Sequence, residues 1–174
     1  MVDLEQLPIG DAAPNTVNVV VEVPVGSRNK YEFDPELGVV IRDRVLPGVV
    51  RYPMDYGFIP STIADDGEPV DVILAAYDPA FPGCVVRARP IGVLEMQDAS
   101  GEDRNVIAVP DDDDRFGDIH DVADLPEANL REISDFFEVY KQLEGDEQVQ
   151  IHGWSGADDA HELIRASARS PQTG

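Results

Sequence analysis

Residues 66–74 read DGEPVDVIL, an acidic turn followed by a short run of strand-forming residues. The run is rich in β-branched residues and is typical of a buried strand. Asp71 stands inside it, where an ionised carboxylate is costly unless a positive group lies beside it. A divalent cation bound through oxygen atoms is a suitable partner. The segment therefore predicts a strand that carries part of a hard-metal site.

Other carboxylates come within reach of Asp71 when the chain folds back on itself. The turn before the strand can bring Asp66 toward Asp71, with Glu68 pointing into the same cleft. Asp98 and Asp103 flank a hairpin-like loop and can lie on either side of one ion. Each segment alone is also an ordinary polar turn, and only their combination favours a metal site.

The available ligands indicate which metal would bind. The chain has a single cysteine, Cys84, and its three histidines lie in dissimilar contexts, so a zinc site of cysteine and histidine is not expected. Ligands that are all oxygen favour Mg²⁺, with Mn²⁺ or another divalent cation as alternatives.

The overall charge excludes several classes of partner. The chain has 13 basic and 35 acidic residues, a formal net charge of −22, which disfavours binding to nucleic acid and to anionic membranes. No apolar run approaches the roughly 20 residues that span a bilayer, so we expect a cytoplasmic protein. Lysine is almost absent: only Lys30 and Lys141 remain beside 11 arginines, which suggests a salt-adapted surface and makes both lysines site candidates.

The length fits one domain, residues 1–174, of mixed α+β class and mainly β, with 1–15 as an irregular N-terminal arm. Short apolar segments predict strands at 16–25, 39–46, 69–76, 84–94, 104–109 and 147–152. Helical spacing predicts helices at 126–143, with Asp124 as N-cap, and at 158–168. We expect loops at 51–62, 110–125 and 153–156. Short strands joined by turns favour a barrel.

A Mg²⁺ site usually shares its ions with substrate phosphate, which needs cationic and phenolic partners. The candidates are Lys30, Arg44, Tyr56, Tyr140 and Lys141. Both tyrosines also fit core packing with a satisfied hydroxyl group, and Tyr140 lies on the apolar stripe of the predicted helix. Lys141 lies off that stripe.

The order and spacing of these residues resemble the soluble inorganic pyrophosphatases of family I over about residues 16–168. The matching motifs are VEVP at 21–24, KYE at 30–32, DR at 43–44, YP at 52–53, DYGF at 55–58, DGEPVDV at 66–72, PIGV at 90–93, GED at 101–103, FFE at 136–138 and YK at 140–141. The acidic, lysine-poor surface suggests a member from a halophilic archaeon.

This resemblance implies a five-stranded barrel of the oligonucleotide-binding type, with peripheral strands, two C-terminal helices and assembly as a homohexamer. It also implies Mg²⁺-dependent hydrolysis of pyrophosphate to two phosphates, by in-line attack of a metal-activated water molecule.

The resemblance gives each matched residue a role. The metal ligands would be Asp66, Asp71, Asp98, Asp103 and Glu32. The groups that hold phosphoryl oxygens would be Lys30, Arg44, Tyr56, Tyr140 and Lys141. The catalytic carboxylates would be Asp66, Asp71, Asp103 and Glu68, supported by Glu22 and Tyr52.

Two positions depart from the family pattern. Glu68 stands where the family usually has an aspartate that accepts the proton of the attacking water. Asn105 replaces a phosphate-contacting lysine, and alternation points the neighbouring Arg104 the other way.

Two other functions stay open. One is a metal-dependent phosphohydrolase that acts on nucleotides. The other is a non-catalytic, acidic cation-binding module. The departures from the family pattern at Glu68 and Asn105 are the features that support it.

Overall fold

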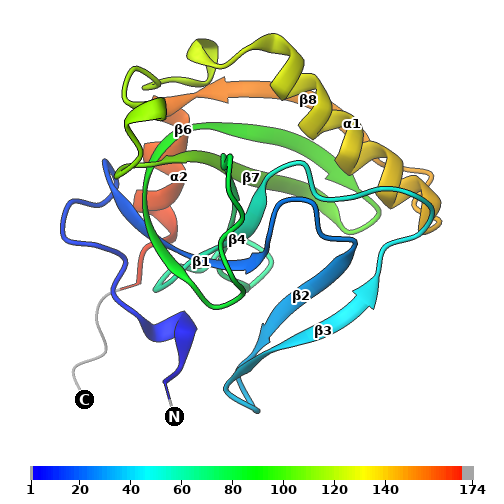
Figure 1. Cartoon of the computed structure of the whole chain (residues 1–174), viewed down its shortest axis with the longest axis horizontal. Coiled ribbons are helices and arrows are strands. Elements are labelled where there is room, and N and C mark those ends of the chain that lie inside the picture. The colour runs from blue at the N-terminus through cyan, green and yellow to red at the C-terminus, as the bar shows by residue number, and fades with distance from the viewer. Residues whose placement is uncertain (1, 170–174) are drawn as a thin grey trace.

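The computed structural model describes residues 2–169. Five of its strands lie side by side in the order β1 (Val17–Val23), β4 (Asp55–Ile59), β5 (Val70–Leu74), β7 (Gly101–Pro110) and β6 (Val85–Asp98). β1 also pairs with β6, from Val17 opposite Ala88 to Val20 opposite Val85, so these strands close into a ring (Figure 1). The predicted mainly β, five-stranded fold is confirmed.

The remaining elements surround this ring. β8 (Gln150–Gly156) extends the sheet at β6, and β2 (Asn29–Asp34) pairs with β3 (Val39–Val45) in a separate hairpin. The helices of the described residues are α1 (Glu127–Leu143), α2 (Ala157–Ser167) and three short 3₁₀ turns at Leu4–Gln6, Asp114–Phe116 and Val122–Asp124. Figure 1 shows the hairpin projecting away from the ring, below α1.

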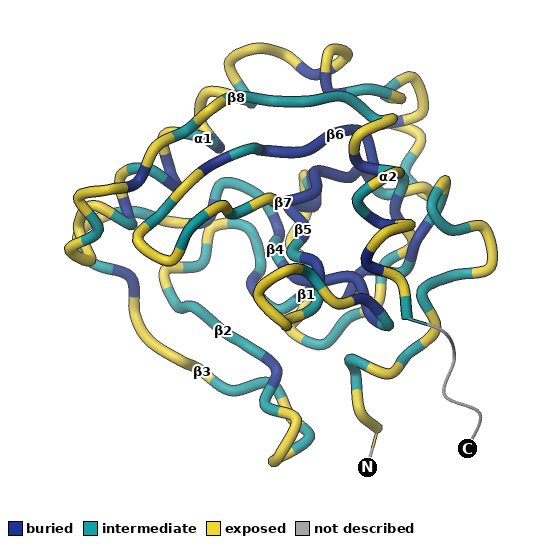
Figure 2. Tube along the Cα trace, turned by 180° about the vertical axis from the view of Figure 1, so that it is seen from behind, coloured by how far each residue is buried: buried dark blue, intermediate teal, exposed yellow. Residues whose placement is uncertain are grey.

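The interior of the ring is apolar. Val19, Val72 and Val106 come from three ring strands, and all three are completely buried. Ala160 and Ile164 of α2 pack into the same cluster. Seen from behind, the buried stretches lie along the ring strands (Figure 2). Burial of this kind stabilises the ring by removing apolar surface from water.

The outer face of the ring carries a second core beneath α1. Ile73 and Ile107 on neighbouring strands belong to the same cluster as Ile133, Phe136 and Phe137 of the helix. The α1 residues recur at helical spacing, so their side chains share one face of the helix. This packing fixes the C-terminal end of α1 beside the outer face of the ring.

A third, smaller cluster attaches the hairpin. Phe33 of β2 packs against Val20 of β1 and Phe58 of β4. The hairpin is therefore joined to the ring near the end that carries the acidic residues.

The predicted loop at 51–62 is wrong, because Asp55–Ile59 forms β4. Gly57 made this segment look like a turn, yet its conformation is extended and its missing side chain has another purpose. A Cβ atom at Gly57 would lie 1.9 Å from the carbonyl oxygen of Val20, so the glycine allows β1 to pair closely with β4.

Two boundary predictions are also corrected. Asp124 does not cap α1; its side chain belongs to a capping box with Asp121 in the preceding 3₁₀ turn, and Pro126 occupies the N-cap position without a side-chain hydrogen bond. Residues 153–156, predicted as a connection, pair with β6 as part of β8.

Across residues 2–169, no helix combines the length and apolarity needed to cross a membrane.

Candidate active site

Asp71 and Asp103 lie on neighbouring ring strands and face the same way. The parallel register of β5 and β7 places Asp71 beside Asn105, and strand alternation puts Asp103 on the same face as Asn105. Ile73, two residues beyond Asp71, belongs to the core beneath α1. The two carboxylates therefore lie on the outer face of the ring, next to that helix.

Asp66 and Glu68 reach this face from the turn before β5. Gly67 has a φ of +88°, a conformation that glycine adopts without strain. Asp66 Oδ1 accepts the N–H of Glu68 at 3.0 Å, and the carbonyl oxygen of Glu68 accepts the N–H of Ala64 at 2.7 Å. The turn thus holds both carboxylates at the edge of the site.

Most of the predicted residues line a single cavity of about 530 Å³ between the ring, the hairpin and the end of α1. The predicted residues on its wall are Glu22, Lys30, Glu32, Tyr52, Tyr56, Asp66, Glu68, Asp71, Asp103, Tyr140 and Lys141. Arg44 and Asp98 are the predicted residues outside this lining. Segments up to about 120 residues apart in the sequence therefore meet in one place.

The carboxylates form an open cluster. Within residues 2–169, no three His, Cys, Asp or Glu side chains lie close enough together to hold a metal ion in their present positions. Asp66, Asp71 and Asp103 share the cavity wall without forming a closed cage. Mg²⁺ usually keeps several water molecules and is held by only one or two protein carboxylates.

Two carboxyl groups of the cavity, Asp71 and Glu22, are disfavoured in their ionised forms. Burial, together with repulsion from Asp103 and Asp66, raises the pKa of Asp71 to about 7. Burial also raises the pKa of Glu22 to about 8, although its Oε1 accepts the N–H of Phe33 at 2.7 Å. Crowded oxygen ligands whose ionised forms are disfavoured fit a divalent cation, which would favour those forms.

Lys141 already occupies a cationic position among the carboxylates. Its Nζ lies 2.7 Å from Asp98 Oδ2 and 3.0 Å from Asp103 Oδ2. Burial alone would lower the pKa of Lys141, but the interactions with Asp103 and Asp98 outweigh it and raise that pKa. Burial likewise opposes ionisation of Asp98, and the contact with Lys141 keeps the pKa of Asp98 below its usual value. Asp98 is thus linked to the cavity through this lysine.

The hairpin supplies the other two cations. Lys30 Nζ lies 3.9 Å from both Glu32 Oε2 and Asp43 Oδ2. Arg44 forms a two-pronged pair with Glu144, from Nε to Oε2 at 2.6 Å and from Nη2 to Oε1 at 2.9 Å, and it also contacts Asp43. Arg44 therefore lies outside the cavity lining, opposite the lining residue Lys30 in the hairpin, and is bound to carboxylates of the protein.

The tyrosines belong to the core and to the cavity at once. The hydroxyl group of Tyr56 donates to Asn105 Oδ1 at 3.0 Å, and Asn105 Nδ2 donates to Asp103 Oδ1 at 3.0 Å. Tyr52 lies between Tyr56, at 5.7 Å between ring centroids, and the α1 aromatic residues. Burial raises the pKa of Tyr140 to about 12, so its hydroxyl group stays protonated and able to donate.

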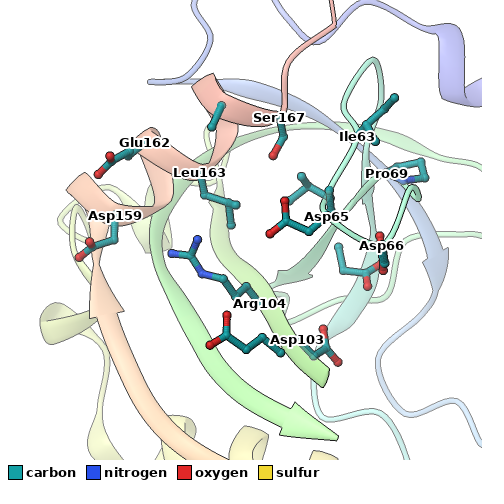
Figure 3. Close-up of a pocket in the computed structure, with 15 residues that line it drawn as sticks. Ile63, Asp65, Asp66, Pro69, Asp103, Arg104, Asp159, Glu162, Leu163 and Ser167 are labelled. Carbon is teal, nitrogen blue, oxygen red and sulfur yellow. The ribbon is translucent and has the colours of Figure 1, made fainter. Parts of the chain in front are cut away.

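A second cavity, of about 440 Å³, adjoins the first on the side of α2 (Figure 3). Asp66, Asp71 and Asp103 line both cavities. Figure 3 shows Asp159 and Glu162 projecting from α2 at the edge of this second space. Its lining contains no lysine, so the first cavity is the one that combines carboxylates with lysines.

Arg104 lines this second cavity and not the first, in line with the prediction from strand alternation that it points the other way from Asn105. It pairs with Glu95 of β6, from Nε to Oε2 at 3.0 Å. Asn105 is completely buried between Tyr56 and Asp103. Neither residue brings a positive charge to the first cavity.

Sequence reasoning missed Glu144. It is the C-cap residue of α1 and lies one helical turn beyond Tyr140. This spacing was a usable signal, because residues four apart share a helix face. The pairing with Arg44, 100 residues earlier, has no counterpart in the local sequence.

Comparison with known proteins agrees with this geometry. A family model described as inorganic pyrophosphatase matches residues 19–172. The inorganic pyrophosphatase of Thermus thermophilus is 49% identical over 168 residues, which cover 95% of this chain and 96% of that protein. That of Halobacterium salinarum is 47% identical, with 92% and 90% covered. The crystal structure of inorganic pyrophosphatase from T. thermophilus matches with a TM-score of 0.92 and 48% identity, over 95% of this chain and 96% of that one. With a family model that covers most of its length and relatives that match it nearly end to end, the chain belongs to the inorganic pyrophosphatase family of enzymes.

Proposed function

We propose that this protein hydrolyses inorganic pyrophosphate to two phosphates, with Mg²⁺ as its cofactor and Mn²⁺ or another divalent cation as an alternative. The observation that supports this most strongly is the composition of the 530 Å³ cavity. Carboxylates from the ring line one side of it, and Lys30, Lys141 and Tyr140 line the same space. Such a site matches a small diphosphate anion accompanied by metal ions.

The residues that would hold the metals are Asp66, Asp71, Asp98, Asp103 and Glu32. When bound, divalent cations lower the pKa of water and polarise phosphoryl oxygens. The raised pKa of Asp71 supports this assignment, because burial and repulsion from Asp103 and Asp66 disfavour its ionised form, which a bound cation would favour.

The remaining residues act on the substrate and on protons. Glu68 lies at the cavity wall on an exposed turn, and its carboxylate would accept a proton from the attacking water molecule. Phosphoryl oxygens would be held by Lys30, Arg44, Tyr56, Tyr140 and Lys141. Together they would hold the two phosphoryl groups for in-line attack and offset the charge on the departing phosphate.

Glu22 and Tyr52 would support the site from behind. Glu22 lies at an irregularity of β1 and binds the backbone of β2 through Phe33, which sets the position of the hairpin. Tyr52 packs against Tyr56 and Phe136, so it joins β4 to α1.

The test is release of phosphate from pyrophosphate in molar KCl, with Mg²⁺, with Mn²⁺ and with a chelator. We expect turnover with metal and none with chelator. Comparable release from ATP would favour a nucleotide phosphohydrolase instead. Metal binding without cleavage of pyrophosphate would favour the non-catalytic cation-binding module.

We further propose that residues 1–174 act as one domain of a cytoplasmic homohexamer in a halophilic archaeon. The net charge of −22 and the near absence of lysine support a salt-adapted surface. The relatives include pyrophosphatases from Halobacterium salinarum and Haloferax volcanii, but also one from T. thermophilus at slightly higher identity. Sedimentation in molar KCl would test the hexamer.

A further inference from the structure

Arg44 is held by acidic groups of the protein, opposite Lys30, which lines the 530 Å³ cavity. Its Nε and Nη2 atoms both bind Glu144, at 2.6 and 2.9 Å, and Asp43 contacts its Nη1. Arg44 does not line the cavity, whereas Lys30, its neighbour in the hairpin, does. The guanidinium group thus has one complete edge occupied by a carboxylate.

Helix stability does not explain why a carboxylate stands at this position. Glu144 is the C-cap residue of α1, and Gly145 ends the helix with a φ of +97°. The C-terminal end of a helix carries partial negative charge and favours cations over carboxylates. Glu144 is therefore unfavourable for α1 itself. Within residues 2–169, Arg44 is the side chain that donates hydrogen bonds to Glu144, and it donates two.

A carboxylate and a phosphate bind a guanidinium group in the same way, through two parallel N–H···O bonds. A phosphoryl group that takes this edge of Arg44 must displace Glu144. Tyr140 lines the cavity one helical turn before Glu144, so the pair lies next to the proposed substrate space.

We propose that Glu144 is an internal competitor for phosphate at Arg44, and that it sets how tightly the site holds phosphate and pyrophosphate. This inference rests on the proposed function, in which Arg44 binds phosphoryl oxygens. Glu144 does not touch the substrate and acts through Arg44. Weaker product binding would favour release of phosphate after each turnover.

The experiment titrates inorganic phosphate into the protein in the presence of Mg²⁺, by calorimetry. The variant Glu144→Gln keeps the shape of the side chain and removes its charge. The side chain of Arg44 is 42% exposed and that of Glu144 is 24% exposed, so solvent screens their pair. We expect phosphate to bind about three- to fivefold more tightly to the variant, and the KM for pyrophosphate to fall by a similar factor.

The matched control is Glu132→Gln, which removes the same charge from an exposed position on α1. It should leave phosphate affinity within about 1.5-fold of the wild type, because an exposed charge far from the contact is screened. A gain equal to that of Glu144→Gln would overturn the inference, since the effect would then come from net charge alone.

A double-variant cycle tests whether Glu144 acts through Arg44. In an Arg44→Gln background, Glu144→Gln should no longer tighten phosphate binding. Persistence of the full gain in that background contradicts the inference. Weaker phosphate binding by Glu144→Gln also contradicts it, because Glu144 would then position Arg44 for the substrate.

These results are separable from the proposed function. If the wild type cleaves pyrophosphate but Glu144→Gln binds phosphate no more tightly, the inference fails and the proposed function stands. If the wild type cleaves no pyrophosphate, the proposed function fails, while tighter phosphate binding by the variant still supports competition at Arg44.

Discussion

Asp71 and Glu22 are carboxyl groups placed where water cannot solvate their charge well. Burial is the main cause of the raised pKa in both, to about 7 and about 8. Replacement of such a carboxyl group by its amide separates the effect of its charge from the effect of its shape, because the amide keeps the shape and removes the charge. At Asp71 the substitution tests the proposed metal-binding role, and at Glu22 it tests the effect of a buried charge on stability.

Asp71→Asn should abolish most of the activity. We expect kcat/KM for pyrophosphate with Mg²⁺ to fall on the order of a hundredfold or more, because the amide cannot replace the charge of the proposed metal ligand. Thermal melting in chelator should show that the variant is folded. The control is Asp65→Asn, an exposed neighbour that lines only the second cavity. An equal loss in both variants would contradict a special role for Asp71.

Glu22→Gln should stabilise the metal-free protein at high pH. The pKa of Glu22 rises from 4.5 to about 8 on folding, so the native state binds more protons than the unfolded state between these values. Wild-type stability therefore falls as the pH rises through this window, and the variant escapes this loss. We expect equal stability at pH 4 and an advantage on the order of 5 kcal/mol at pH 9, measured by urea unfolding in chelator.

The amide keeps the acceptor oxygen that binds the N–H of Phe33, so the hairpin contact survives in Glu22→Gln. Glu36→Gln, in an exposed turn of the same hairpin, serves as the control and should show no such dependence. A variant that is less stable than the wild type at pH 9 would mean that the ionised form of Glu22 is favoured in the native state.

At the scale of elements, α1 carries two of the proposed phosphate ligands. Ile133, Phe136 and Phe137 on its buried face pack into the second core beneath α1. Tyr140 and Lys141 follow within one turn. Rigid packing of this face fixes where these two side chains reach the cavity. Stability and substrate affinity should therefore change together when the face is altered.

Ile133→Ala tests this coupling. Ile133 is completely buried, so its truncation should cost about 2–5 kcal/mol of unfolding free energy. The KM for pyrophosphate should rise as the end of α1 shifts. Val139→Ala on the same helix is the control, because Val139 is 41% exposed and its loss should stay within about 0.5 kcal/mol. An unchanged KM in a destabilised Ile133→Ala protein would show that α1 does not position the site.

Prediction of the elements succeeded where the sequence repeats a local pattern. The apolar spacing that predicted a helix at 126–143 corresponds to α1 at Glu127–Leu143. It failed at 51–62, where Gly57 serves a contact with β1 more than 30 residues earlier. It also failed at Asp124, whose carboxylate accepts a backbone hydrogen bond within the 3₁₀ turn before α1 and does not cap the helix. In both cases a tertiary or neighbouring contact overruled the usual preference of the residue.

The whole molecule combines a closed ring of strands in residues 2–169 with a strongly acidic surface. Self-repulsion at a net charge of −22 opposes the compact state when little salt is present. At 1 M salt the screening length falls to about 3 Å, so most of this repulsion disappears.

The melting temperature should therefore rise with salt. Between 0.05 and 2 M KCl in chelator, we expect an increase of roughly 5–10 °C, followed by circular dichroism. Sucrose at matched osmolality distinguishes screening from general exclusion of solute, and it should give a smaller increase. A melting temperature that falls with KCl would show that attractive surface pairs outweigh the repulsion.

The sequence by itself determined the strand that carries Asp71, the face of α1 that is buried, and the rarity that marked Lys30 and Lys141. The strand and the helix face depend on neighbours two to four residues apart, which a single chain segment already contains, and the rarity of lysine is a count over the whole sequence. Only the tertiary structure decided the closure of β1 on β6, the meeting of Lys141 with Asp98 and the pairing of Arg44 with Glu144. Those contacts join residues about 40 to 100 positions apart, and which partner each group finds depends on how the whole chain packs.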